Sequence, residues 1–128
     1  MSKPIEVQLM EVLNEYQDSL RDKIHGDFEE IGKETSEDLR NVSKNTFKTH
    51  AKSRKYWRGW TYKMQGEGLD SRVTIYNRNA PGLTHLLENG HQVYAWGKNR
   101  GRYNGVKHIE PAEKEATERL LRKLTNDL

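Results

Sequence analysis

The chain has 128 residues, 22 Lys+Arg against 19 Asp+Glu, no cysteine, 33% hydrophobic residues and a mean hydropathy of −1.06. This size indicates one domain, residues 1–128, and the composition excludes disulfides, thiolate zinc sites, a secretory signal and a membrane span, so we expect a soluble intracellular protein. The low apolar fraction has two explanations, which are self-association that supplies buried surface and long, solvated helices.

The N-terminal part, residues 4–53, is expected to be helical. Apolar residues recur at three- and four-residue steps over 4–25, which predicts an amphipathic helix with Pro4 in its first turn. Gly26 is expected to end this helix, and Asp27 is a good N-cap for a second helix that runs from 28 to about 53. Gly32 weakens the second helix by about 1 kcal/mol relative to alanine. We therefore expect the second helix to lean on the first or on another subunit.

The remainder, residues 57–128, is expected to hold a sheet and a C-terminal helix. Alternating apolar residues predict a β-hairpin over 57–78, and a two-turn helix follows over 83–89 with Gly90 as its left-handed C-cap. A third strand is expected over 91–96, a mobile surface loop over 97–107 and a last helix from Pro111. The predicted fold class is α+β, with a small antiparallel sheet packed against two N-terminal helices, a short connector helix and a C-terminal helix.

Charge is strongly segregated along the chain. Residues 1–38 hold eleven acids and four bases, residues 39–66 hold eight bases and no acid, and residues 89–109 hold four bases and no acid. Four lysines at steps of four, four and three are expected to form one helical stripe, which either meets double-stranded DNA, is solvated, or pairs with the acidic helix of a neighbour. The bases of the glycine-rich loop are expected to face a partner or DNA. The stripe is Lys44, Lys48, Lys52 and Lys55, and the loop bases are Lys98, Arg100, Arg102 and Lys107.

The sequence carries no recognisable catalytic or metal motif. It has no His-Glu-x-x-His, no nucleophile elbow and no phosphate loop, and the spacing of His85, His91 and His108 is not that of zinc ligands. We therefore expect no catalytic residue, no metal and no cofactor. A metal-independent ribonuclease stays an alternative, because His, Lys, Arg and Tyr can stabilise a phosphorane-like transition state. The three tryptophans, Trp57, Trp60 and Trp96, are expected to anchor a core or an interface.

Two fixed segments enclose the basic, glycine-rich stretch. The first is Leu83-Thr84-His85-Leu86-Leu87-Glu88-Asn89-Gly90-His91, and the second is His108-Ile109-Glu110-Pro111-Ala112. In order and spacing they resemble the neck-protein family of long-tailed phages that completes tails or joins them to heads. The basic middle of this chain, Lys44 to Lys63, departs from that pattern. The positions that carry the resemblance are expected to be structural: Leu83, His85, Leu86, Leu87, Glu88, Asn89, Gly90, His91, His108, Pro111 and Ala112.

The resemblance implies a non-enzymatic assembly protein with an α+β fold. Its expected partners are copies of itself in a cyclic ring, the head-closure protein, the tail terminator or tail tube, and the passing double-stranded DNA, with no membrane. Its expected location is the host cytoplasm during assembly and the virion neck or tail afterwards. The alternative is a small basic nucleic-acid-binding module or a ribonuclease toxin.

Overall fold

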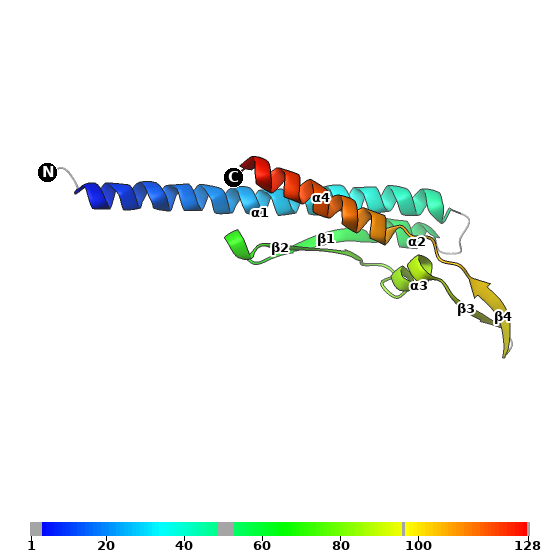
Figure 1. Cartoon of the computed structure of the whole chain (residues 1–128). Helices are drawn as coiled ribbons and strands as arrows, with labels where there is room; N and C mark the ends of the chain where they lie inside the picture. Colours follow the sequence, from blue (N-terminus) through cyan, green and yellow to red (C-terminus); the bar gives the residue numbers. More distant parts are fainter. Residues whose placement is uncertain (1–3, 49–52, 96, 128) are drawn as a thin grey trace.

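One long helix is the spine of an α+β fold. The computed structural model describes residues 4–48, 53–95 and 97–127. The first of two small antiparallel hairpins and the C-terminal helix lie along the second half of this long helix, and the second hairpin projects beyond its C-terminal end (Figure 1). In chain order the elements are α1 (Ile5–Thr46), α2 (Ser53–Arg58), β1 (Trp60–Gln65), the 3₁₀ turn η1 (Gly68–Asp70), β2 (Arg72–Asn77), α3 (Leu83–Asn89), β3 (His91–Ala95), β4 (Lys98–Tyr103) and α4 (Ile109–Asp127).

Helix α1 passes through Gly26 without a break, so the predicted end at Gly26 and the N-cap role of Asp27 are wrong. The helix is 42 residues long and ends at Thr46, before the expected end at about 53. A glycine inside a helix costs only about 1 kcal/mol, which tertiary contacts easily offset. Such contacts flank this position, because Gly68 of η1 lies against the Arg21 side chain and His25 Nδ1 is 3.0 Å from the Ser71 hydroxyl.

The β1–β2 hairpin packs on one side of α1, as the alternating apolar residues predict. The strands pair antiparallel from Trp60 opposite Asn77 to Gln65 opposite Arg72. Gly32 is buried where this hairpin crosses α1, and a Cβ there would lie 2.6 Å from the Val73 side chain and 2.8 Å from the Tyr62 ring. The glycine that weakens the helix therefore lets the sheet approach it closely.

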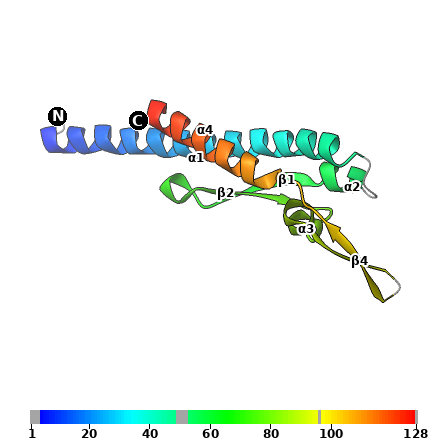
Figure 2. The ribbon, with the colours of Figure 1, turned by 45° about the vertical axis from the view of Figure 1, so that its right-hand side comes forward.

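Helix α4 runs antiparallel to α1 on a different side (Figure 2). Arg119 pairs with Asp38 at 3.0 Å and with Glu34 at 3.5 Å, and Lys123 pairs with Glu30 at 3.0 Å. These pairs fix the antiparallel order, since later residues of α4 meet earlier residues of α1. The helix begins at Ile109, two residues before the expected start, and Pro111 occupies its first turn, where a missing N–H costs nothing.

The core lies at the C-terminal end of α1. Phe47 leaves the helix with φ −111° and is buried, so the chain turns back and α2 covers α1. Trp60 is also buried, and its indole N–H donates to the Ser43 hydroxyl at 2.9 Å, which confirms that this tryptophan is a core anchor. The buried cluster is Leu39, Phe47, Tyr56, Trp60 and Leu87.

Residues Lys98–Tyr103 of the basic, glycine-rich stretch form strand β4, so the predicted mobile loop over 97–107 is wrong. Strand β4 pairs antiparallel with β3, with His91 opposite Tyr103 and Ala95 opposite Lys98. Backbone pairing does not require apolar side chains, which is why a basic segment can be a strand. The two hairpins form separate two-stranded sheets rather than the single expected sheet. Trp96, expected at the end of β3, lies outside the described residues. No helix in the described ranges has the length and apolar character needed to cross a bilayer.

Candidate functional site

A buried carboxylate joins the two segments that carry the family resemblance. Glu88, near the end of α3, accepts backbone N–H bonds from His108 (2.7 Å) and Ile109 (2.8 Å) at Oε1, and from Glu110 (3.0 Å) at Oε2. These are the N–H groups that the first turn of a helix leaves without intrahelical partners, so Glu88 caps α4 from twenty residues away. We call this contact the clasp. Glu88 is buried and turned toward α4.

The clasp sets the charge state of its carboxylate. Burial alone would raise the pKa of Glu88, but the three backbone N–H bonds and the nearby His108 ring outweigh burial, and the pKa lies below its usual value. The carboxylate is therefore ionised at neutral pH. An ionised acceptor at a helix N-terminus is also favoured by the helix dipole.

Below the clasp, His108 pairs with a tyrosine inside the core. His108 Nδ1 lies 2.8 Å from the Val106 carbonyl and 3.0 Å from Glu88 Oε1, and both of these atoms only accept. Nδ1 therefore carries a hydrogen, and Nε2 is hydrogen-bonded to the Tyr56 hydroxyl at 2.6 Å. Burial, and then the charge of Glu88, raise the pKa of Tyr56 well above its usual range. The rings of Phe47 and Trp60 pack edge-on around His108, at 4.9 and 6.4 Å between centroids.

This Tyr56–His108–Glu88 chain resembles an acid–base relay but has a structural role here. The exposed fractions of Tyr56 and His108 are 1% and 3%, so neither side chain is accessible to a substrate. Within the described parts of the chain, no group of three His, Cys, Asp or Glu side chains could hold a metal ion. The arrangement fixes the start of α4 and fills the core; it offers no surface for chemistry.

The base of the β3–β4 hairpin is closed by the same segment. Gly90 ends α3 with φ +83° and ψ 173°, so it is not the left-handed helical cap that the sequence predicts. This extended conformation with positive φ favours glycine, and a Cβ there would collide with the Tyr103 carbonyl oxygen. The Val106 N–H donates to the Leu87 carbonyl at 2.8 Å. Asn89 accepts Arg102 at its carbonyl (3.0 Å) and Lys107 at its side-chain oxygen (2.6 Å). Arg102 and Lys107, two of the four bases expected to face a partner, therefore also bind Asn89 of the first motif segment.

The remaining motif positions divide between the core and the surface. Leu87 is buried, and Leu83 and Ala112 pack against the core. His91 is half-buried and lies against the Tyr103 ring at 5.6 Å between centroids. The side chains of His85, Leu86 and Pro111 are exposed.

The four lysines predicted to form one helical stripe do not form one. Lys44 lies in the last turn of α1, Lys48 follows the end of that helix, and Lys55 lies on α2, which runs back over α1. Lys52 lies outside the described residues. The helix ends at Thr46 because Phe47 enters the core, so the four-residue spacing does not continue along one surface.

The bases instead gather at one end of the molecule. Helix α2 and the β3–β4 hairpin both lie at the end opposite the N-terminus (Figure 1). Trp57 is half-buried there, between Lys44 at 5.0 Å and Arg58 at 5.3 Å from its ring. Lys98, Arg100 and Arg102 occupy alternate positions on the exposed strand β4. The sequence identifies both basic segments, but it does not show that they lie at the same end of the molecule.

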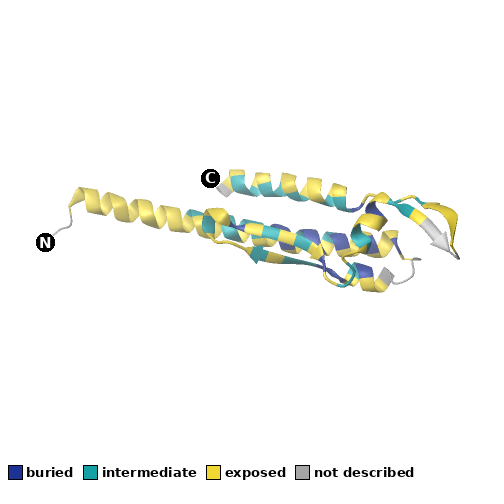
Figure 3. Ribbon diagram, turned by 90° about the horizontal axis from the view of Figure 1, so that it is seen from below, coloured by how far each residue is buried: buried dark blue, intermediate teal, exposed yellow. Residues whose placement is uncertain are grey.

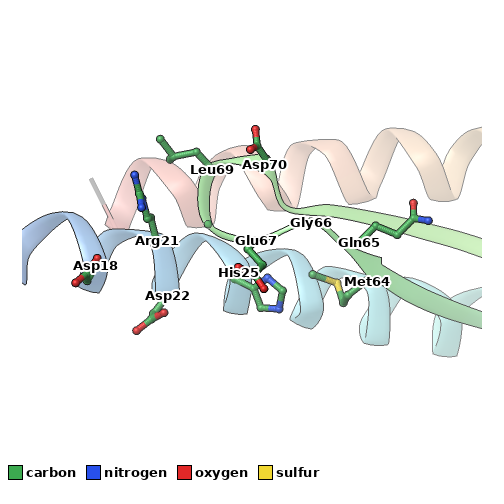
Figure 4. Close-up of a pocket in the computed structure, with 11 residues that line it drawn as sticks. Asp18, Arg21, Asp22, His25, Met64, Gln65, Gly66, Glu67, Leu69 and Asp70 are labelled. Carbon is green, nitrogen blue, oxygen red and sulfur yellow. The ribbon is translucent and has the colours of Figure 1, made fainter.

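An open, polar hollow lies at the tip of the β1–β2 hairpin (Figure 4). Its volume is about 1120 Å³, and it lies between α1 and the turn that joins the two strands. Acids predominate on its lining, without the grouping that a metal ion needs. The hollow lies where the β1–β2 hairpin contacts α1. The lining residues with ionisable side chains are Asp18, Arg21, Asp22, His25, Glu67 and Asp70.

Comparisons with protein-family models, with curated proteins and with solved structures give no match to this chain.

Proposed function

We propose that this protein is a structural and assembly protein of the neck of a long-tailed phage. It completes the tail, or joins it to the DNA-filled head, through ring-forming contacts between protein surfaces. The observation that carries the proposal is the clasp: the two segments that resemble the neck family meet at Glu88 and His108. Together they form a rigid base that presents an exposed basic hairpin, which suits a protein that works by docking.

The distribution of charge supports ordered docking. The first half of α1 carries Glu6, Glu11, Glu15 and Asp18 without a base between Pro4 and Ser19, whereas the opposite end carries α2 and the basic hairpin. Opposite charge at the two ends favours contacts of one polarity. On this proposal the partners are copies in the ring, the head-closure protein and the tail terminator or tube. The basic end faces one of these proteins or the passing duplex.

Complementation of a phage that lacks the protein tests the proposal. The triple variant Lys98→Ala, Arg100→Ala, Arg102→Ala is expected to lose no more than the exposed Arg102–Asn89 hydrogen bond, about 1 kcal/mol, and to fail in joining heads to tails. The matched control replaces three exposed bases elsewhere: Lys33→Ala, Lys114→Ala and Arg122→Ala. The control is expected to join normally. Normal joining by the hairpin variant would remove these bases from the mechanism, and infectious virions without the protein would overturn the proposed function.

The second candidate is a nucleic-acid-binding module, which the cluster of Lys44, Trp57 and Arg58 favours. The two cations can bind phosphates, and the half-buried aromatic ring beside them can stack on a base. This function predicts binding of random duplex DNA that weakens steeply with salt, and Lys44→Ala with Arg58→Ala should reduce the salt slope. A neck protein should bind free DNA weakly. Salt-steep binding by the isolated protein would therefore favour the second candidate.

A further inference from the structure

The first half of α1 carries an apolar stripe that no other described element covers. Every residue from Pro4 to Ser19 is exposed (Figure 3). Four apolar residues follow along one side of this half at steps of four, three and four, and they are 72, 57, 62 and 60% exposed: Ile5, Leu9, Val12 and Tyr16. We call these four residues the stripe, and Leu13 at its margin is 55% exposed. A contiguous exposed apolar surface of this kind marks a site of interaction.

The stripe lies on the side of α1 that α4 covers further along the helix. Three acids of α1 pair with Arg119 and Lys123 of α4, and these acids are Glu30, Glu34 and Asp38. At 100° per residue, the mean direction of the stripe around the helix is within about 10° of the mean direction of these acids. Lys123 meets Glu30 and α4 ends four residues later, so α4 reaches about the level of Gly26. A helix therefore already packs on this side of α1, and the stripe extends the same side beyond it.

We infer that two copies of this chain form an antiparallel dimer in which the stripe of one α1 packs against the stripe of the other. A two-fold axis perpendicular to the helices relates the copies, so both present the same surface. A parallel pair is disfavoured, because the partner's α1 would continue along the side that α4 already occupies. In the antiparallel pair, the body of each copy lies beyond the N-terminus of the other. The inference does not depend on the proposed function, because it uses only α1 and leaves the basic end of the molecule free.

The stripe is complementary to itself in the antiparallel direction. When Ile5 of one copy lies level with Tyr16 of the other, Leu9 lies level with Val12, and the two-fold axis repeats both pairs. Each pair joins a larger side chain to a smaller one, which suits the close packing of two helices. Leu13 at the margin then lies within about 1.5 Å, along the axis, of the level of Leu9 in the other copy. All five exposed apolar side chains on this side therefore gain an apolar partner.

The same register leaves room for the rest of each copy. Pro4 of the partner reaches the level of Gln17, which is about 14 Å along the helix from the level of Gly26, where α4 ends. The β1–β2 hairpin lies on another side of α1, because its turn meets Arg21, whose direction is about 150° from that of the stripe. The described part of the partner's helix therefore reaches neither α4 nor the hairpin.

The acids of this half lie away from the contact or far apart across it. At 100° per residue, Glu11 and Asp18 point more than about 120° away from the stripe. Glu6 and Glu15 lie on opposite margins of the stripe, and the two copies of each are about 14 Å apart along the helices, beyond the Debye length of about 8 Å at physiological salt. The dimer therefore brings no like charges together. The same acids would repel an anionic bilayer, which makes a membrane surface an unsuitable alternative partner.

Sedimentation velocity on the full chain tests the dimer. The contact spans about three turns of each helix, which is small for a stable interface, so the parent should be a dimer at about 100 μM and dissociate near 1 μM. Leu9→Asp with Val12→Asp should weaken the dimer at least about a hundredfold, because it places four carboxylates in the central layers. A monomeric parent at about 100 μM would overturn the inference.

The matched control carries the same change on another side of the same helix. Val7→Asp with Met10→Asp also replaces two exposed apolar residues three positions apart, but both point at least about 130° away from the stripe. This variant should dimerise like the parent, and circular dichroism should show equal helix content in both double variants. Equal weakening of the dimer by the two double variants would refute the assignment of the contact to the stripe.

Cross-linking reads the direction and register of the two helices, since the chain has no cysteine of its own. Ile5→Cys and Tyr16→Cys are prepared as single variants and mixed at about 100 μM, where the dimer should form. A short thiol cross-linker should join the mixed pair but neither variant alone, because the two copies of either position would be about 17 Å apart along the helices. Cross-linking of each single variant to itself, without the mixed product, would show a parallel pair and would overturn the antiparallel dimer.

Discussion

Replacing Glu88 by Gln tests whether the clasp stabilises the fold. The carboxylate accepts three backbone N–H groups at 2.7, 2.8 and 3.0 Å. The amide oxygen of Gln can still accept two of them, but without charge, which costs about 1 kcal/mol for each bond. The third N–H would face the amide NH₂ group and would lose its partner, at about 1–3 kcal/mol if no water reaches it. We expect Glu88→Gln to lower the free energy of unfolding by about 3–5 kcal/mol.

The contribution of Glu88 to the free energy of unfolding should depend on pH. The pKa of Glu88 is lowered in the folded state, so its contribution is fully present above the unfolded pKa of about 4.3 and is lost as pH falls through the lower, folded pKa. The difference between parent and variant should therefore be largest at neutral pH and should shrink below about pH 4. Glu110→Gln, an exposed acid in the first turn of the same helix, is the control.

Urea unfolding at several pH values measures both quantities. Equal stability of Glu88→Gln and the parent at pH 7 would show that the clasp contributes nothing. A difference that stays constant into the acid range would show that the charge of Glu88 is not responsible.

Other variants test the glycines and the buried tyrosine. Gly26→Ala should stabilise the protein by about 1 kcal/mol in urea unfolding, since that helical position has open space, whereas Gly32→Val should destabilise it by more than that because the sheet lies against it. Gly90→Val should prevent folding as read by circular dichroism, because φ is +83° and the Tyr103 carbonyl blocks a side chain. Tyr56→Phe should cost about 1 kcal/mol, since the hydroxyl bonded to His108 is lost; an unchanged melting temperature would contradict this.

The local parts of the fold could be predicted because short-range patterns determine them. The β1–β2 hairpin follows from alternating side chains, and α3 with its glycine cap follows from three leucines and Asn89-Gly90. The fold class was therefore confirmed. Gly26 was misread because its effect on helix propensity is small compared with the packing on either side of it, which a single sequence does not display.

The clasp was missed because it joins residues twenty positions apart. One signal could have indicated it: α4 starts after His108, which is not a residue that usually caps a helix with its own side chain. A helix without a local cap requires an acceptor from elsewhere, and Glu88 lies beside the buried Leu87 at the end of the preceding helix. The loop of bases was misread as mobile because its strand is specified by backbone pairing with β3 rather than by apolar alternation.

The contacts at Glu88, Gly90 and Val106 close the chain on itself before and after the second hairpin. These contacts hold both ends of the β3–β4 hairpin. A change in the length of the hairpin therefore has little effect on the rest of the molecule. Doubling such a loop costs only about 0.6 kcal/mol of closure entropy. The segment 92–101 is therefore a natural graft site: a longer or differently charged hairpin can be exchanged there while Arg102, Tyr103 and the helices beneath keep their contacts.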